Sequence, residues 1–325
     1  MQLSIAAATD LAMRILTRHG MSAAWARQVA DHLVDASLCG HEFSSLSRLT
    51  AIVPEMRGKT PGAIRVVRET PFSAQIDGGD NVAYVVSLHA IDKAVAICRT
   101  NGIAVVCANN TWFSGRLAYY VERAARQGMI AMHTTNTTAR VAPHGGMDRL
   151  LGTNPFAIAF PSEDEPLIID LATATTSWGD VLLSKAKGEP LAPGIAVDID
   201  GIPTLDPDAA LDGAFLTWGG ARGSALSSAV HLLGILAGAP AVIPDASNYG
   251  LFFLVINPDL IMPDGQYKTR VSEFRRLIST SRPAPGAGPV RVPGDGSLQR
   301  RKRGLATGVV QIDDKVYAQL LELQD

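Results

Sequence analysis

The sequence has few of the features that mark metal-binding proteins. Its only cysteines are Cys39, Cys98 and Cys107, an odd number at unrelated spacings that forms neither a zinc motif nor a disulfide framework. All three stand among apolar residues, which favours small buried side chains over reactive thiols. We therefore expect no bound metal.

Charge of one sign and long apolar runs are also scarce. The 29 basic and 31 acidic residues leave a net charge of −2, which provides no long-range field for nucleic acid or an anionic membrane. No apolar run reaches the roughly 18 residues of a membrane span, and Met1–His19 lacks the basic-then-apolar order of a signal peptide. We expect a cytoplasmic protein that binds neither nucleic acid nor membrane.

The common nucleotide-binding and hydrolase motifs are missing as well. There is no Gly-x-Gly-x-x-Gly, since Gly286-x-Gly288 lacks the third glycine and is flanked by prolines. There is also no phosphate-binding P-loop, no His-Glu-x-x-His and no Gly-x-Ser-x-Gly. An ordinary Rossmann fold, a zinc protease and a serine hydrolase are therefore disfavoured.

The 325 residues, 47% of them apolar, are enough for one large or two closely packed α/β domains. Periodicity and turn residues predict a series of helices and strands in a β–loop–α–β order. The expected helices are 6–18, 23–38 with Ser22 as N-cap, 82–101, 117–127, 224–238 and 313–323. The expected strands are 64–67, 73–76, 103–108, 129–134, 156–161, 166–171 and 251–257. The 224–238 helix is apolar enough that we expect it to be buried, and we expect 109–115 to be a polar loop.

Four loops combine glycine with hydrogen-bonding residues. They are Pro143–Gly146, Gly152–Pro155, Asp170–Thr173 and Trp218–Ser224. Glycine lets backbone N–H groups approach a ligand, and the helix start after the last loop favours an anion. Each loop alone fits an ordinary turn, but together they favour a small-molecule site.

Several segments in order resemble one known family, the type-2 malate/L-lactate dehydrogenases. The segments are Gly152–Pro155, Ile169–Thr173, Asp200–Pro207, Gly219–Leu226 and Val292–Gly294. The family includes malate, sulfolactate, ureidoglycolate and 2,3-diketogulonate enzymes, and also Δ1-piperideine-2-carboxylate/Δ1-pyrroline-2-carboxylate reductases. The resemblance spans almost the whole chain.

The resemblance implies an α/β fold that is not Rossmann. We expect a mixed-sheet NAD(P)-binding domain over residues 116–296. A second domain would combine the N-terminal helices with the C-terminal helix, over residues 1–115 and 297–325. The expected partners are a small-molecule carboxylate and a second copy of the chain in a homodimer, and the expected cofactor is NADPH or NADH.

The implied reaction is hydride transfer to a carbon that bears C=N or C=O beside a carboxylate. Family members carry Gly-x-x-Ser-His-Gly-x-x-Arg, and Gly40 to Arg48 fits that length. Arg48 then anchors the substrate carboxylate, unless it forms a surface salt bridge. The family histidine falls on Ser44, which is a weaker proton donor. His41 lies three residues earlier and is a second candidate donor, or a capping or surface residue.

Two further departures favour the cyclic-imine branch. Asp180 follows Gly179 where many hydroxy-acid members have lysine, and a carboxylate there would favour a protonated iminium substrate. Its alternative role is a helix cap. Phe113 stands where hydroxy-acid members usually have histidine, so it forms either an apolar wall for a ring substrate or part of the core.

The resemblance assigns the cofactor to residues spread along the chain. They are Ser114, Gly115, Arg116, Leu117, His144, Thr153, Asp170, Leu171, Ala172, Arg222, Gly294 and Asp295. The basic run Arg300–Arg303 would contact the 2′-phosphate of NADPH or form a solvated face. The preferred function is reduction of a cyclic imine carboxylate to the L-amino acid. The alternatives are a 2-oxo acid reductase or 2-hydroxy acid dehydrogenase, and a catalytically silent paralogue that binds NAD(P).

Overall fold

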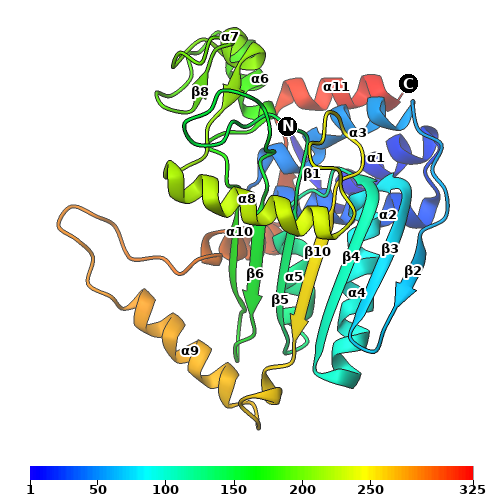
Figure 1. Ribbon diagram of the computed structural model, residues 1–325, viewed down its shortest axis with the longest axis vertical. Helices are drawn as coiled ribbons and strands as arrows, with labels where there is room; N and C mark the ends of the chain where they lie inside the picture. Colours follow the sequence, from blue (N-terminus) through cyan, green and yellow to red (C-terminus); the bar gives the residue numbers. More distant parts are fainter. Residues whose placement is uncertain (325) are drawn as a thin grey trace.

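The computed structural model describes residues 1–324, which form a central sheet with helices on both faces (Figure 1). The α-helices are α1 Ile5–Arg18, α2 Ala23–Leu38, α3 Leu49–Met56, α4 Ala83–Asn101, α5 Ala118–Ala125, α6 Trp178–Lys187, α7 Pro207–Asp212, α8 Ala221–Leu236, α9 Gln266–Ser279, α10 Asp295–Thr307 and α11 Asp314–Gln324. The short 3-10 turns are η1 Glu42–Ser44, η2 Leu46–Arg48 and η3 Pro258–Leu260. The strands are β1 Gln2–Ser4, β2 Arg65–Glu69, β3 Ser73–Val82, β4 Ile103–Trp112, β5 Ile130–Thr135, β6 Phe156–Phe160, β7 Leu167–Leu171, β8 Ala196–Val197, β9 Ala214–Phe215, β10 Leu251–Ile256 and β11 Val309–Gln311.

Seven strands form the main sheet in the order β2-β3-β4-β10-β5-β6-β7. Only the β3–β4 pair is parallel, and α4 makes the crossover between these two strands. The sheet is therefore mixed, and the expected non-Rossmann α/β class is confirmed. β2, β3 and β4 precede residue 115 and the other four strands follow it, so this sheet combines strands from both sides of the expected domain boundary.

Strand residues alternate between the two faces of this sheet. Ala104, Val106 and Ala108 of β4 are buried on the face that α4 and α5 cover, together with Phe253 of β10. α8 crosses the opposite face near one end of the strands (Figure 1). The polar loop expected to begin at residue 109 is wrong in part, since β4 continues to Trp112.

A second core lies among the N-terminal helices α1, α2 and α3 and the C-terminal helix α11, with Leu16, Leu33, Leu46 and Ile52 fully buried in it. β1 pairs with β11, which places the start of the chain beside the strand that precedes the C-terminal helix α11. Ser22 caps α2 as predicted, because its hydroxyl accepts from the Trp25 N–H. A small lobe of α6, α7, β8 and β9 is built around Val181 and Phe215.

The expectation that the apolar helix after residue 224 is buried is wrong for one of its faces. α8 buries Val230, His231 and Gly234, but Leu232 is 64% exposed and Leu236 is 65% exposed. Apolar composition cannot distinguish burial within one chain from a surface left open for another. The three cysteines are free and buried as expected, and no helix among residues 1–324 is long and apolar enough to cross a bilayer.

Candidate functional site

Arg48 lies at the end of η2, where the chain enters α3. Leu46 and Leu49 on either side of it are fully buried and fix this turn in the N-terminal core. The Arg48 Cζ lies 4.1 Å from the centroid of the Phe113 ring and 4.9 Å from that of Phe43. No carboxylate among residues 1–324 lies within salt-bridge distance of this guanidinium. Aromatic faces hold the cation and no carboxylate neutralises it, so an anion could bind here.

Phe43 connects this turn to the start of α6. Its ring lies directly on Gly179, where an added Cβ would come 1.7 Å from the Phe43 Cε2. No other residue than glycine permits this contact without moving the ring. Trp178, the residue before Gly179, packs against Arg140. The Arg140 Cζ lies 4.0 Å from the centroid of the Trp178 ring.

Phe113 follows β4 and has a positive φ of 45°. It packs edge-on against Trp112, with ring centroids 5.5 Å apart, and against Tyr249 at 6.4 Å. The residue is only partly buried, and its ring supports Arg48. Its packing on Trp112 and Tyr249 fits the core alternative, and a role as the apolar wall for a ring substrate stays a prediction.

Asp180 caps α6. Its carboxylate accepts hydrogen bonds from the Ser177 hydroxyl at 2.7 Å and from the Ser177 N–H at 3.3 Å, while the Ser177 hydroxyl accepts from the Asp180 N–H. This is a complete capping box. The helix-capping alternative is the one that the structure shows, and a role of Asp180 toward the substrate stays a prediction.

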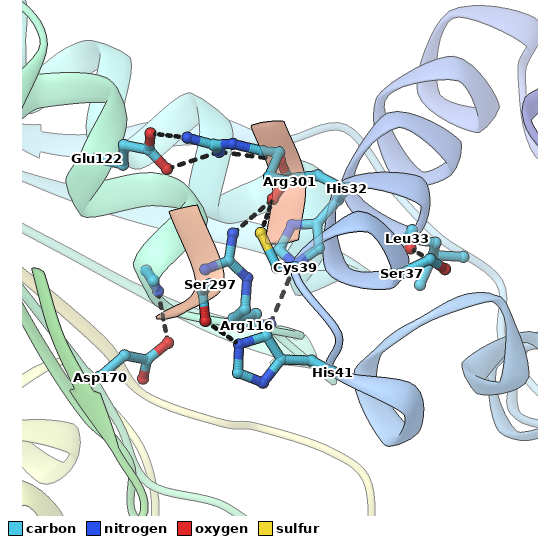
Figure 2. Close-up of polar contacts among 12 residues, drawn as sticks. His32, Leu33, Ser37, Cys39, His41, Arg116, Glu122, Asp170, Ser297 and Arg301 are labelled. Atoms are coloured by element: carbon cyan, nitrogen blue, oxygen red, sulfur yellow. Dashed lines mark hydrogen bonds and ion pairs between the residues drawn. The ribbon is translucent and has the colours of Figure 1, made fainter. Parts of the chain in front are cut away.

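The two candidate proton donors lie in different surroundings. Ser44 is partly buried in η1, and its hydroxyl forms no hydrogen bond with the described part of the chain. His41 instead lies on the α10 side, where its Nε2 is 3.1 Å from the Ser297 hydroxyl (Figure 2). Desolvation and the positive charges of Arg116 and Arg300 lower the pKa of His41 to about 4, so the ring is neutral near pH 7. Little of the protonated ring is present near pH 7, so His41 has scarcely any proton to donate as a general acid.

His41 borders a small cavity together with three of the residues expected to bind the cofactor, Arg116, Asp170 and Gly294. The cavity measures about 110 Å³ and is lined also by Cys39, Ala118, Glu122, Ile168, Ser297 and Leu298. Asp170 accepts a hydrogen bond from the Ala118 N–H at the start of α5, at 2.8 Å. Protein atoms pack against one side of the Asp170 carboxylate, and this desolvation raises its pKa. The other side of the residue is exposed to solvent.

The side chain of Arg116 already has a partner within the chain. It forms an ion pair with Asp35 of α2, which also binds Arg301 of α10 at 3.0 Å. Arg301 in turn pairs with Glu122 of α5. The Arg116 N–H donates to the Nε2 of the buried His32 at 3.0 Å. This cluster connects α2, α5 and α10 beside the cavity.

The basic run 300–303 largely binds the protein itself. Arg300 donates to the carbonyl oxygen of Cys39 at 2.7 Å, Arg301 belongs to the ion cluster, and Lys302 pairs with Glu165 at 2.8 Å. Asp295, expected at the cofactor, pairs with Arg275 at 2.7 Å. A role of the whole run at a cofactor phosphate therefore has little support.

The glycine-containing loops do come together at one end of the sheet. The Thr173 N–H donates to the carbonyl oxygen of Thr153 at 2.9 Å, and the indole of Trp218 donates to that of Ala172 at 2.7 Å. The N–H of His144 donates to the Ser224 hydroxyl at 3.0 Å. These bonds join the loops around 144, 153, 172 and 218 into one assembly at the start of α8.

The start of α8 has the chemistry that a cofactor phosphate requires. Gly219 and Gly220 have positive φ values of 63° and 59°, which turn the backbone into the helix. The first turn of α8 holds the exposed Arg222 and no acidic residue. Open N–H groups, the helix dipole and a cation all favour a bound phosphate group. The residues therefore fit a dinucleotide here.

Comparison with known proteins decides the family. The family model described as malate/L-lactate dehydrogenase matches residues 3–321. The chain belongs to this family. It is 33% identical to the L-sulfolactate dehydrogenase of Methanocaldococcus jannaschii over 96% of this chain and 93% of that protein. The recognition of the family from its motifs is confirmed.

Solved structures agree with this assignment. A dehydrogenase from Sinorhizobium meliloti superposes with a TM-score of 0.92 at 30% identity, covering 100% of this chain and 98% of that one. The Δ1-piperideine-2-carboxylate reductase of Pseudomonas syringae pvar. tomato superposes with a TM-score of 0.89 at 29% identity, covering 99% of each chain. The protein is thus an oxidoreductase of the dehydrogenase type, and such enzymes use NAD(H) or NADP(H).

Sequence reasoning missed two residues that the structure connects to Arg48 through neighbouring side chains. Arg140 and Tyr249 come from loops far apart in the chain, and no motif joins them to Gly40–Arg48. The one available signal was position, because Arg140 lies three residues before the expected Pro143–Gly146 loop.

Proposed function

We propose that the protein uses NADPH or NADH to interconvert a small 2-oxo acid and its 2-hydroxy acid, with the substrate carboxylate on Arg48. The observation that carries this proposal is the Arg48 guanidinium, which lies on Phe113 without an acidic partner among residues 1–324. A guanidinium can bind a carboxylate through two parallel hydrogen bonds, which also fixes the orientation of the adjacent carbon.

The cofactor would bind along the loops at the start of α8. Gly219, Gly220 and Arg222, with His144 beside them, would hold its phosphates, and Asp170 and Gly294 border the nearby cavity. When bound, the nicotinamide supplies or accepts the hydride. Leu171, Ala172 and Thr153 form the hydrogen-bonded loops that would support it, and Ser114, Gly115 and Leu117 form the turn before α5.

The proton would reach the substrate oxygen through Ser44. Its hydroxyl has no partner within residues 1–324, and it lies in the segment that carries Arg48. A serine donates a hydrogen bond to the oxygen but is a poor acid by itself. Solvent is therefore the proton source in this proposal, and His41 acts at the cofactor side of the site.

A cyclic imine carboxylate is the second candidate substrate. It is favoured by Ser44, which stands where the resemblance leads one to expect a histidine, and by the Phe113 ring beside Arg48. A protonated iminium is already activated for hydride attack and needs no strong acid. The capping box of Asp180 weakens this candidate, because that carboxylate is engaged with Ser177.

We also propose that two copies of the chain associate through the exposed face of α8. Leu232, Ile235 and Leu236 are exposed on it, and no charged residue lies between Gly223 and Leu236. Exposed apolar surface of this kind marks an interaction site. The three free, buried cysteines fit a reducing compartment such as the cytoplasm.

One substrate panel tests the proposed reaction. Oxidation of NADPH and NADH is followed with oxaloacetate, pyruvate, Δ1-piperideine-2-carboxylate and Δ1-pyrroline-2-carboxylate. We expect turnover of at least one 2-oxo acid. Turnover of the imines alone would establish the second candidate, and cofactor binding without turnover of any of the four would identify a silent NAD(P)-binding paralogue.

A further inference from the structure

Arg140 is a second cation in the site, and nothing in the proposed reaction uses it. It lies in the loop after β5, with its Cζ 4.0 Å above the Trp178 ring, and it is partly buried. No carboxylate among the described residues is within salt-bridge distance of it. A buried or half-buried arginine usually has such a partner, so an unpaired one invites an anionic ligand.

Two separate sets of contacts connect Arg140 with Arg48 through other side chains. In the first set, the Arg48 guanidinium lies over the Phe43 ring, and that ring packs on Gly179. Trp178 precedes Gly179 in the chain, and its ring packs against the Arg140 guanidinium. These contacts connect the two guanidinium groups through adjoining side chains.

The other set of contacts passes through Tyr249. Its hydroxyl is 2.7 Å from that of Thr138, two residues before Arg140, and its ring packs on Phe113, which supports Arg48. Burial raises the pKa of Tyr249 and the charge of Arg48 opposes that rise, while burial lowers the pKa of Arg140 and Tyr249 opposes that fall. Tyr249 therefore interacts with both arginines and connects them.

The charges around Arg140 add to its attraction for an anion. Burial and the like charge of Arg149 lower the pKa of the Arg140 guanidinium. Arg149 itself donates to the carbonyl oxygens of Leu211 and Gly213, which leaves its positive charge uncompensated. Asp180, the nearest acidic residue along the chain from Trp178, is held by Ser177.

We propose that Arg140 binds a second anionic group of the substrate, so that the site selects dianionic 2-oxo or 2-hydroxy acids over monoanionic ones. The carboxylate beside the reacting carbon binds Arg48, and a carboxylate or sulfonate at the far end of the substrate binds Arg140. A substrate with one anionic group leaves Arg140 without a partner, and a cationic iminium ring is repelled by it. This inference rests on the proposed function.

The test compares oxaloacetate with 2-oxobutanoate in the wild type, Arg140→Met and Arg140→Lys. A hydrogen-bonded charge contributes about 1.5–3 kcal/mol, so Arg140→Met should raise KM for oxaloacetate roughly 10- to 100-fold. KM for 2-oxobutanoate should change less than about threefold, because that substrate makes no contact with Arg140. Arg140→Lys keeps the charge and should restore part of the affinity.

Arg123→Gln is the matched control, since Arg123 is exposed on α5 and pairs with Asp92. It should leave both KM values unchanged. An Arg140→Met enzyme whose KM for oxaloacetate equals that of the wild type would overturn the inference. A parallel rise in KM for both substrates would overturn it too, because it would indicate a general structural effect.

A binding measurement separates this inference from the proposed function. Malonate is a dianion with no reducible carbon, and acetate is its monoanionic counterpart. Calorimetry should show that the wild type binds malonate at least about tenfold more tightly than acetate, and that Arg140→Met removes the difference. Reduction of 2-oxo acids without a malonate preference would overturn only the inference. A malonate preference without any reduction would overturn only the proposed function.

Discussion

The side chain of His32 connects α2 to the turn that begins α5. It is fully buried and accepts the Arg116 N–H, and it packs edge-on against Tyr84 with ring centroids 4.7 Å apart. Burial, reinforced by the charge of Arg116, lowers its pKa to about 3. His133 is similarly buried, with a pKa lowered to about 3 by desolvation. The folded protein therefore holds both rings neutral well into the acid range.

These two histidines predict acid sensitivity of the fold. Below the usual histidine pKa of about 6.5 the unfolded chain takes up protons that the folded chain does not, so the free energy of unfolding falls as pH decreases. The loss is about 1.4 kcal/mol per pH unit for each histidine, from about pH 6.5 down to the folded pKa. Above pH 6.5 neither residue contributes a pH dependence.

Urea unfolding of the wild type and His32→Gln at about pH 7.5 and about pH 5.5 measures this slope. The variant should lose less stability between the two pH values than the wild type does. The exposed His89 provides the control His89→Gln, which should retain the wild-type slope. Equal slopes for the wild type and His32→Gln would contradict the assigned role of His32.

At the scale of elements, the contact between η1 and α6 positions Arg48, the proposed carboxylate anchor. A methyl group at Gly179 would collide with the Phe43 ring, which supports the Arg48 guanidinium. Gly179→Ala should therefore displace the 41–48 segment and lower kcat/KM by about tenfold or more, because misplacement by about 1 Å can cost 100-fold. Steady-state kinetics checks this, alongside a thermal melt to confirm that the variant is folded.

Gly288→Ala is the control for that substitution. No atom lies within 4 Å of an added Cβ at Gly288, and its backbone needs no positive φ. Its kcat/KM should match the wild type. If Gly179→Ala also matched the wild type, the Phe43–Gly179 contact would have no part in holding Arg48.

The elements also show how far the sequence alone could lead. Helices α1, α2 and α4 and the buried strands followed from periodicity and caps, because local sequence determines them. α9 was not expected, since Gln266–Ser279 is polar and none of its residues is buried. The resemblance supplied Arg48 and the loops near α8. It could not supply Arg140 or the Phe43–Gly179 contact, because these depend on packing between distant segments.

On the scale of the whole molecule, one face of α8 remains open. Leu232 and Leu236 lie one turn apart there, more than half exposed, on a helix that carries no charge after Arg222. A double variant, Leu232→Lys with Leu236→Lys, should convert a dimer to a monomer, because two charges would have to be buried in the interface. Light scattering coupled to gel filtration reports the mass directly.

Exposed leucines elsewhere provide the comparison. Leu182 and Leu183 on α6 are also exposed, and Leu182→Lys with Leu183→Lys should keep the dimer. A wild-type protein that is monomeric at all concentrations, or an α8 double variant that remains dimeric, would contradict the proposed interface.

The central claim is that Arg48 binds the carboxylate beside the reacting carbon. The most direct test is the rate of nicotinamide oxidation by Arg48→Met, with Arg57→Met at the exposed end of α3 as control. We predict that kcat/KM for the best 2-oxo acid falls about 100-fold or more in Arg48→Met and is unchanged in Arg57→Met, while cofactor affinity stays the same in both. An Arg48→Met enzyme that reduces the acid as efficiently as the wild type would contradict the account.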